Sequence, residues 1–253
     1  MIVRCARLAA CAVFAAVVSA ACANPFAPTY EYEEQVYLSV DGSATVVIDS
    51  SLAALVALRG LSIDRSASGA TDRDTIQRLF AAAGCAVENV SRIWTRSGRR
   101  FVQVRIAAAD VKQLPSCAPL AWSSYGLAPI DDDGLRYQQL VGAAAGADPG
   151  VVNWRGDELV AFKLHLPSRI RWHNVKLLDG TTNGEIERGN ILTWVQTLKA
   201  RRAGTPLEIA VEMDQTSILN TTLWVFAGAF AAAVGALVLI IWLVIRKGRR
   251  TTL

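Results

Sequence analysis

Hydrophobic and polar positions follow three patterns along the chain, and each pattern predicts a different kind of structure. Residues 8–23 and 223–245 are continuous apolar runs without a charged side chain. Between them, residues 24–221 show mainly the two-residue alternation of β-strands, with two short segments at helical spacing. Two short helices among roughly ten strands predict a single α+β domain built mainly on antiparallel sheet.

The clearest strand signals are two hairpins. Residues 30–40 place apolar and polar side chains on alternate faces, and the same pattern resumes after the Asp-Gly pair at 41–42. This arrangement predicts a two-residue hairpin turn. Residues 85–96 and 99–108 predict a second hairpin across the Ser-Gly pair at 97–98.

Several further strands are predicted in the rest of the domain. A pair is expected on either side of an Asp-Asp-Asp-Gly turn, and the segment LKARRAG is expected to be the turn between the last two strands. In chain order these strands cover residues 120–127, 134–142, 158–166, 170–178, 191–198 and 206–213.

Caps and spacing predict the two short helices. Ser50 and Ser51 precede an apolar segment that ends at Gly60, which is typical of a capped helix. Thr71 and Asp74 form an approximate capping box before a second helix. The apolar stripe of that helix consists of Ile76, Leu79, Phe80 and Ala83.

The C-terminal apolar run predicts a membrane span. Its 23 residues would form a helix of ~34 Å, enough to cross a bilayer core of ~30 Å. A buried core helix is the alternative, but every face is apolar and a basic segment, 246–250, follows at once. Because positive residues stay on the cytoplasmic side, we expect a transmembrane helix at 222–245, a cytoplasmic basic tail at 246–253 and an extracytoplasmic domain at 24–221.

Residues 1–23 predict a secretory signal peptide, because two arginines precede an apolar stretch that ends in small residues. Two processing routes fit this segment. Cleavage after Ala23 matches an A-x-A site, whereas the residues from Ser19 to Cys22 form a weak lipobox in which Cys22 would be lipidated. An uncleaved membrane anchor is a third reading.

Cys85 and Cys117 are the cysteines that remain once the signal segment and its processing site are set aside. In an exported domain, two cysteines predict one disulfide. It would close a loop of about 30 residues and stabilise the domain by ~3–4 kcal/mol. Two separate buried thiols are the alternative.

Charge and motifs narrow the possible functions. Six of the 26 basic residues flank the apolar ends, which leaves 20 basic against 22 acidic residues in the domain. A nucleic-acid binder needs a basic surplus that this domain lacks. The sequence has no nucleophile elbow, phosphate-binding loop or zinc-protease motif, and its two histidines have no second ligand at metal spacing. We therefore expect no enzyme activity, no metal and no cofactor.

Two predicted turns carry basic clusters. If both turns point the same way, they form a basic rim that can contact anionic lipid headgroups or acidic glycans. Solvation of ordinary hairpin tips is the alternative. The candidate ligand contacts are Arg96, Arg99, Arg100, Lys199, Arg201 and Arg202.

Two short motifs occur on this framework. The early hairpin reads Val-x-Leu-x-x-Asp-Gly-Ser on residues Val36, Leu38, Asp41, Gly42 and Ser43. A later pattern falls on Pro167, Ile170, Asn174, Gly189, Asn190, Leu192, Thr193 and Trp194. With the export signal and the C-terminal membrane helix, this layout resembles the LppM-type envelope lipoproteins known from mycobacteria. The resemblance implies a mixed α/β domain that binds lipid or glycolipid, with no catalytic residues. Ser19 departs from the lipobox of that family.

Together these features predict a single-pass protein of the cytoplasmic (inner) membrane, anchored in the bilayer through 223–245. Its expected role is non-catalytic binding of a lipid, a glycolipid or an envelope protein partner. A hydrolase acting on envelope material and a structural or assembly factor are the alternatives.

Overall fold

The computed structural model describes residues 29–63 and 72–248. The predicted signal peptide at 1–23, the lipidation candidate Cys22 and the capping residue Thr71 lie outside the described residues. The domain strands are β1 (Tyr30–Leu38), β2 (Ala44–Ser51), β3 (Val87–Val90), β4 (Trp94–Arg96), β5 (Arg99–Ala108), β6 (Ser123–Pro129), β7 (Gly134–Val141), β8 (Leu159–His165), β9 (Ser168–His173), β10 (Ile191–Thr197) and β11 (Leu207–Ser217).

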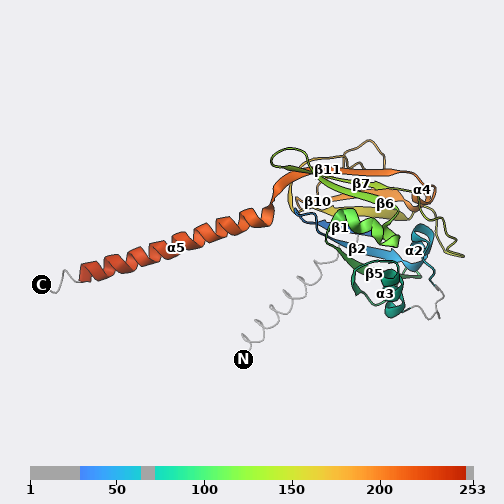
Figure 1. The fold of residues 1–253 in the computed structure, drawn as a ribbon, viewed down its shortest axis with the longest axis horizontal. Helices are drawn as coiled ribbons and strands as arrows, with labels where there is room; N and C mark the ends of the chain where they lie inside the picture. Colours follow the sequence, from blue (N-terminus) through green and yellow to red (C-terminus); the bar gives the residue numbers. More distant parts are fainter. Residues whose placement is uncertain (1–28, 64–71, 249–253) are drawn as a thin grey trace, which may run out of the picture.

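The strands form two sheets that pack face to face (Figure 1). The larger sheet has the order β10-β8-β1-β2-β5-β3, with β4 also paired to β5, and the smaller sheet has the order β6-β7-β11-β9. Every pairing is antiparallel except that of β1 with β8, which is parallel. The prediction of an α+β domain, mainly antiparallel sheet, is confirmed.

Alternation along the strands builds the core. In β1 the side chains of Tyr32, Val36 and Leu38 are buried, as their common face predicted. Val211 and Met213 of β11 come from the facing sheet and join the same hydrophobic cluster. Because side chains of a strand point to alternate faces, each sheet supplies one apolar face to the layer between them.

The two predicted helices are present; the first has the predicted caps, whereas the second is capped by Asp72 and not by the predicted Thr71. In α2 (Leu52–Arg59) the Ser51 hydroxyl accepts from the Ala54 N–H at 3.0 Å, and Gly60 ends the helix with a φ of 68°. In α3 (Arg73–Ala82) the cap is Asp72, whose carboxylate accepts from the Thr75 N–H at 2.8 Å. Three short elements were not predicted: α4 (Leu198–Arg202) and the 3₁₀ helices η1 (Val111–Ser116) and η2 (Ala118–Leu120).

Of the two hairpin turns predicted to contain two residues, one has that length and the other is longer. Between β4 and β5, Ser97 and Gly98 both have positive φ, 50° and 74°, as a two-residue type I′ turn requires, so that prediction is confirmed. Between β1 and β2, the N–H of Ser39 donates to the carbonyl of Ser43 at 2.9 Å and encloses a three-residue loop. The predicted two-residue turn is wrong in length, because Asp41 accepts from Ser43 and supports a wider loop.

The predicted turn between the last two strands is also wrong. Strand β10 pairs with β8 in the larger sheet, whereas β11 pairs with β7 and β9 in the smaller one. The chain therefore crosses between the sheets, and α4 makes the crossing. Its first turn is capped by Thr197, whose hydroxyl accepts from the Ala200 N–H at 3.2 Å.

A disulfide joins Cys85 and Cys117, whose Cα atoms lie 4.5 Å apart, so the predicted bridge is confirmed. Cys85 follows α3, and Cys117 lies between η1 and η2. Next to it, the Ala118 N–H donates to the Ala83 carbonyl at 2.9 Å. The bridge thereby attaches α3 to the segment that precedes the smaller sheet.

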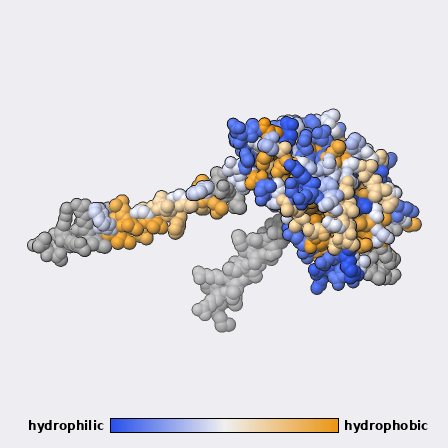
Figure 2. Space-filling model, viewed as in Figure 1, coloured by the Kyte–Doolittle hydropathy of each residue, from blue (hydrophilic) through white to orange (hydrophobic). Residues whose placement is uncertain are grey.

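Helix α5 (Ile218–Gly248) continues directly from β11 and projects away from the domain (Figure 1). It contains a 21-residue apolar stretch, Thr222–Trp242, none of it buried against the rest of the described structure. Figure 2 shows this stretch as a largely hydrophobic rod. A helix of this length and composition is able to span a membrane.

The domain has two distinct ends along the strands. The α5 end holds the β1–β2 turn, Pro167 and the start of α5, where the Ile218 N–H donates to the Pro167 carbonyl at 2.9 Å. The far end holds Tyr30 at the start of β1, together with α2 and α4 (Figure 1). Nine residues of β1 separate the two ends, which corresponds to ~26 Å at 3.3 Å per residue.

Candidate functional site

Strand direction brings distant segments together at the far end. Strands β1 and β5 run the same way because both are antiparallel to β2, and β8 is parallel to β1. All three therefore begin at the far end, and β10, antiparallel to β8, finishes there. The Ser97-Gly98 turn, the loop before β8 and α4 consequently meet at this end.

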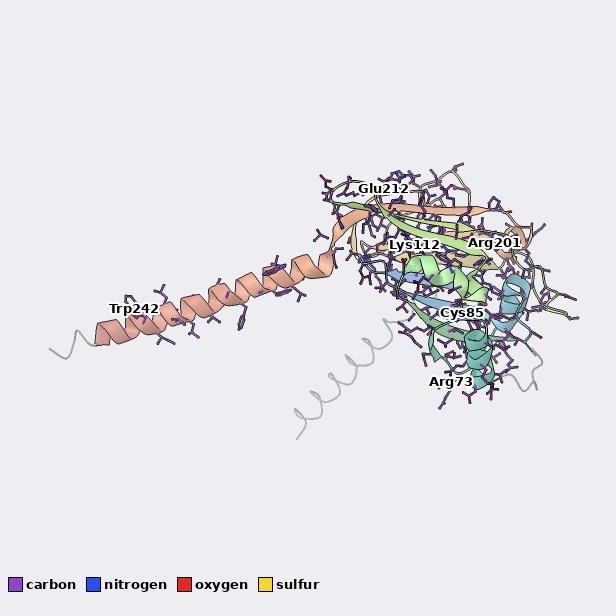
Figure 3. All side chains as sticks on the ribbon, in the orientation of Figure 1. Arg73, Cys85, Lys112, Arg201, Glu212 and Trp242 are labelled. Carbon is purple, nitrogen blue, oxygen red and sulfur yellow. A yellow bond between two sulfur atoms is a disulfide. The ribbon has the colours of Figure 1, made fainter. Side chains whose placement is uncertain are left out.

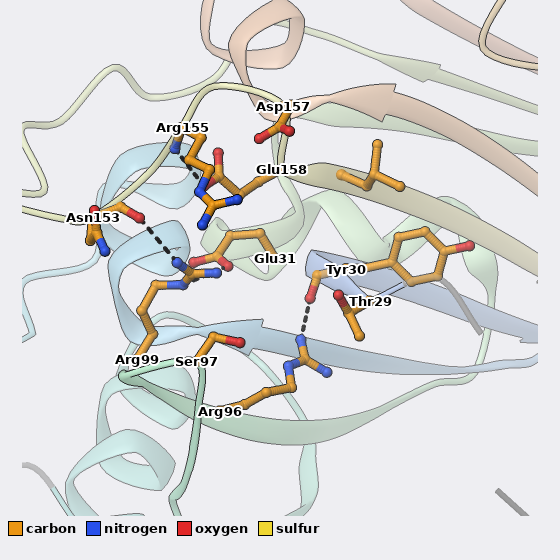
Figure 4. A pocket seen from close by; sticks show the side chains of 11 residues that line it. Thr29, Tyr30, Glu31, Arg96, Ser97, Arg99, Asn153, Arg155, Asp157 and Glu158 are labelled. Carbon is orange, nitrogen blue, oxygen red and sulfur yellow. Dashed lines mark hydrogen bonds and ion pairs between the residues drawn. The ribbon is translucent and has the colours of Figure 1, made fainter. Parts of the chain in front are cut away.

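A polar pocket of about 430 Å³ lies where these segments meet (Figure 4). Its walls come from the start of β1, the β4–β5 turn and the loop that precedes β8. The lining residues are Thr29, Tyr30, Glu31, Arg96, Ser97, Arg99, Asn153, Arg155, Asp157, Glu158 and Leu159.

Two arginines predicted from the sequence stand in this pocket. Arg96 donates to the backbone carbonyl of Tyr30 and stacks over the ring of Phe101, 4.0 Å from its centroid. Arg99 pairs with Glu31 at 3.0 Å and donates to the Asn153 carbonyl at 3.2 Å. Arg96 is therefore held by a backbone carbonyl and an aromatic ring, and Arg99 by a carboxylate and a backbone carbonyl, which fixes their positions on the pocket wall.

The loop before β8 contributes residues that sequence reasoning missed. The side chain of Glu158 accepts from the backbone N–H groups of Arg155 at 2.7 Å and Gly156 at 2.8 Å, which shapes the loop. Burial raises the pKa of Glu158, but these hydrogen bonds outweigh burial and lower the pKa overall. Figure 4 shows the Arg155 guanidinium pointing into the pocket. The sequence signal was the cluster NWRGDE, a polar loop that carries a tryptophan.

Trp154 connects the second basic cluster to the pocket. Its indole N–H donates to Glu31 at 2.8 Å, and the Arg202 guanidinium lies 5.5 Å from its ring centroid. Lys199 is exposed on the same helix as Arg202. Arg100 lines a smaller neighbouring hollow of about 290 Å³ beside the start of α2. Both basic clusters therefore lie at the far end, as the hypothesis of a shared rim requires.

Arg201 is the exception, and its assignment to the rim is wrong. Its side chain is fully buried, donating to Gln196 at 3.1 Å and to the Gly142 carbonyl at 2.8 Å. Burial lowers the pKa of Arg201 to about 10, and the nearby charge of Arg59 acts in the same direction. Figure 3 shows Arg201 on α4, at the opposite side of the molecule from Trp242 in α5. Because α4 crosses between sheets, one of its faces turns inward.

The interior between the sheets holds a second polar group, centred on Glu34. This carboxylate is 1% exposed and pairs with Arg59 at 2.9 Å. Tyr32, Tyr125 and Gln139 also donate to it, at 2.9, 2.9 and 3.0 Å. Sequence reasoning placed Glu34 on the apolar face of β1 but did not identify its partners.

Each histidine packs against its own local neighbours in the described part of the chain. The ring of His165 stacks on Tyr37 with centroids 3.9 Å apart, and burial lowers its pKa. Burial also lowers the pKa of His173, whose Nδ1 accepts from the Val175 N–H at 3.3 Å. Within residues 29–63 and 72–248, no group of three or more His, Cys, Asp or Glu side chains could hold a metal ion.

No protein-family profile and no curated protein matches the chain. Among solved structures, it is similar to the NMR structure of the folded domain of LppM from Mycobacterium tuberculosis. The identity is 11%, and the match covers 78% of this chain and 96% of that one, with a TM-score of 0.39. The similarity is a weak structural relationship.

Proposed function

We propose that this chain is a membrane-anchored envelope protein of the LppM type that binds an acidic saccharide, free or as the headgroup of a glycolipid, in the far-end pocket. The observation that carries the proposal is the convergence of Arg96, Arg99 and Arg155 on one polar pocket. In this proposal α5 crosses the cytoplasmic membrane, its C-terminus is cytoplasmic, and the domain lies outside the cytoplasm. The binding involves no chemical reaction.

The pocket chemistry favours a saccharide ligand. Guanidinium groups bind carboxylate or phosphate through paired charge-assisted hydrogen bonds. Asp157 and Asn153 add a carboxylate and a carboxamide for hydroxyl groups. A ligand with one acidic group and several hydroxyls matches this mixture better than a purely anionic or purely apolar ligand.

Distance favours a saccharide over the lipids that surround α5. The far end lies ~26 Å from the α5 end, by the length of β1. The surface potential of anionic lipids falls off within a Debye length of ~8 Å at physiological ionic strength. The basic residues at the far end therefore gain little from the bilayer that holds α5.

Hydrolysis is the second candidate, because three carboxylates line the pocket. A general acid at neutral pH needs a raised pKa. The pKa of Glu158 is instead lowered, and Glu31 is occupied by Arg99 and Trp154. These contacts support binding over catalysis.

A binding assay on the full chain in nanodiscs tests the proposal. The probes are a uronic-acid trisaccharide and the same trisaccharide with its carboxyl groups reduced to alcohols. We expect tighter binding of the acidic probe, and a loss of affinity of about 10- to 100-fold in Arg155→Gln, because one charge-assisted hydrogen bond contributes ~1.5–3 kcal/mol. Arg105→Gln, an exposed arginine away from the pocket, is the matched control.

Equal binding of the two probes would reject the acidic class of ligand. Equal losses in Arg155→Gln and Arg105→Gln would reject the pocket as the site. Release of reducing ends from the trisaccharide, abolished by Glu31→Gln, would favour the hydrolase instead.

A further inference from the structure

A second hollow, here called the α5 groove, lies at the opposite end of the domain. Its volume is about 690 Å³. It is formed by the β1–β2 turn, the β8–β9 turn, the loop before β10 and the first turn of α5. The lining residues are Ser39, Val40, Leu166, Pro167, Arg188, Gly189, Asn190, Ser217, Ile218 and Thr222.

The walls of the groove are fixed by hydrogen bonds between its segments. Asn190 donates through its side-chain amide to the Leu166 carbonyl at 3.0 Å, and the Leu166 N–H donates back to the Asn190 carbonyl at 2.9 Å. On the other side, the Ile218 N–H donates to the Pro167 carbonyl at 2.9 Å. These hydrogen bonds fix the shape of the groove and connect the domain to the start of α5.

Arg188 gives the groove its charge. Arg188 and Gly189 have φ values of 51° and 80° because they form a tight turn, closed by the Ile191 N–H donating to the Glu187 carbonyl at 2.9 Å. The adjacent carboxylate of Glu187 already accepts from the Thr193 hydroxyl at 3.2 Å. An exposed arginine that lines a groove with apolar walls is complementary in charge to an anionic partner.

The position of the groove along α5 identifies what surrounds it. Thr222 lines the groove and is also the first residue of the apolar stretch Thr222–Trp242. Ile218 is four residues earlier, ~6 Å along the helix axis. The headgroup layer on each side of a bilayer is ~5–7 Å thick. When α5 spans the membrane, the groove therefore lies at the level of the lipid headgroups.

We propose that the α5 groove holds one anionic phospholipid of the surrounding bilayer. Arg188 pairs with the phosphate and headgroup charge, while Val40, Leu166 and Ile218 contact the glycerol and upper acyl region. The groove is continuous with the apolar surface of α5, so a lipid enters it from the bilayer without leaving the membrane. The inference rests on the membrane anchoring in the proposed function, but not on the far-end pocket.

Photo-crosslinking of the full chain in nanodiscs tests this site. The discs contain equal amounts of phosphatidylcholine and phosphatidylglycerol, and the photoreactive residue p-benzoylphenylalanine replaces Val40. The matched control replaces Val151, an exposed valine at the far end. We expect lipid adducts by intact mass at position 40 and none at position 151, with phosphatidylglycerol at least 3-fold over phosphatidylcholine.

Arg188→Gln separates headgroup recognition from simple proximity. In the Arg188→Gln variant, the ratio of phosphatidylglycerol to phosphatidylcholine adducts at position 40 should fall to about 1, the ratio of the two lipids in the disc. An absence of lipid adducts at position 40, equal yields at positions 40 and 151, or an unchanged ratio in Arg188→Gln each overturns the proposal. If the Val40 variant fails to fold, Ser39 lines the same groove and carries the photoreactive residue instead. Reconstitution through α5 with no adduct would reject the groove and leave the anchor intact.

Discussion

The buried charges between the two sheets support a prediction about stability. Glu34 pairs with Arg59 at 2.9 Å, and both side chains are at most 1% exposed. Arg201 is also fully buried, and its charge interacts with that of Arg59. The interior therefore contains two guanidinium groups and one carboxylate in this cluster, an excess of one positive charge. Removing the carboxylate should consequently be more damaging than removing Arg59.

The size of each loss of unfolding free energy depends on which buried charge remains without a partner after the substitution. Breaking a buried ion pair by removing one partner costs ~3–5 kcal/mol, because the other charge remains without compensation. In Arg59→Met, Glu34 keeps its hydrogen bonds from Tyr32, Tyr125 and Gln139, so we expect a loss near the lower limit, about 3 kcal/mol. In Glu34→Gln, two buried guanidinium groups lose their only carboxylate in the cluster, and we expect a loss nearer 5 kcal/mol.

The double variant measures the coupling between the two residues. The combined loss in Glu34→Gln/Arg59→Met should be smaller than the sum of the single losses by about 2 kcal/mol or more. The assay is urea unfolding of the full chain in detergent, followed by tryptophan fluorescence, with the exposed Arg105→Met as control. Additive losses of unfolding free energy, or a larger loss in Arg59→Met than in Glu34→Gln, would refute the conclusion that the buried cluster has an excess of positive charge.

Three further substitutions test local features of the fold. Cys85→Ala/Cys117→Ala should lower the free energy of unfolding by about 4 kcal/mol, because the bridge spans a sequence separation of 32; a loss in urea unfolding that matches that of reduced wild-type protein confirms this origin. Burial and then Glu33 raise the pKa of Asp49 to about 6, so the folded state binds this proton more tightly and the free energy of unfolding should fall as the pH rises from about 4 to 6. Asp49→Asn should remove about 1–2 kcal/mol of that fall, roughly half the full value because the side chain is partly exposed; equal pH profiles in the variant and the wild type would contradict it. Gly98→Val should cost about 1–2 kcal/mol, because Gly98 has a φ of 74° in a type I′ turn, and a melting temperature unchanged from wild type would contradict that reading.

Features set by neighbouring residues could be predicted from the sequence. The Ser51 cap and Gly60 stop of α2 depend on side chains within one or two helical turns. The Ser97-Gly98 turn depends on the positive φ that this pair tolerates. The disulfide follows from counting cysteines in a domain that the sequence predicts to be exported. In each case the deciding interaction is local or is limited to one choice of partner.

Features that depend on which distant strands pair with each other could not be predicted from the sequence. The segment 198–204 fits a turn as well as a short helix, and only the assignment of β10 and β11 to different sheets makes it a crossing. Arg201 was therefore placed on an exposed rim although it is buried. Glu34 lay on the apolar face of β1 in the sequence pattern. The partners Arg59, Tyr125 and Gln139 that permit its burial are 25, 91 and 105 residues away.

The far-end pocket depends on one pairing that the sequence pattern does not contain. Antiparallel pairing through β2 already directs β1 and β5 the same way, so the Tyr30 lead-in and the turn at 97–98 would meet in any such meander. The loop with Arg155 joins them only because β8 is parallel to β1. Had β8 paired antiparallel to β1, this loop would lie beside α5, and the arginines of the two segments would be separated by the length of the sheet. A parallel pair needs a long connection; residues 39–158 connect β1 to β8, and the last part of this connection, the loop between β7 and β8, lines the pocket.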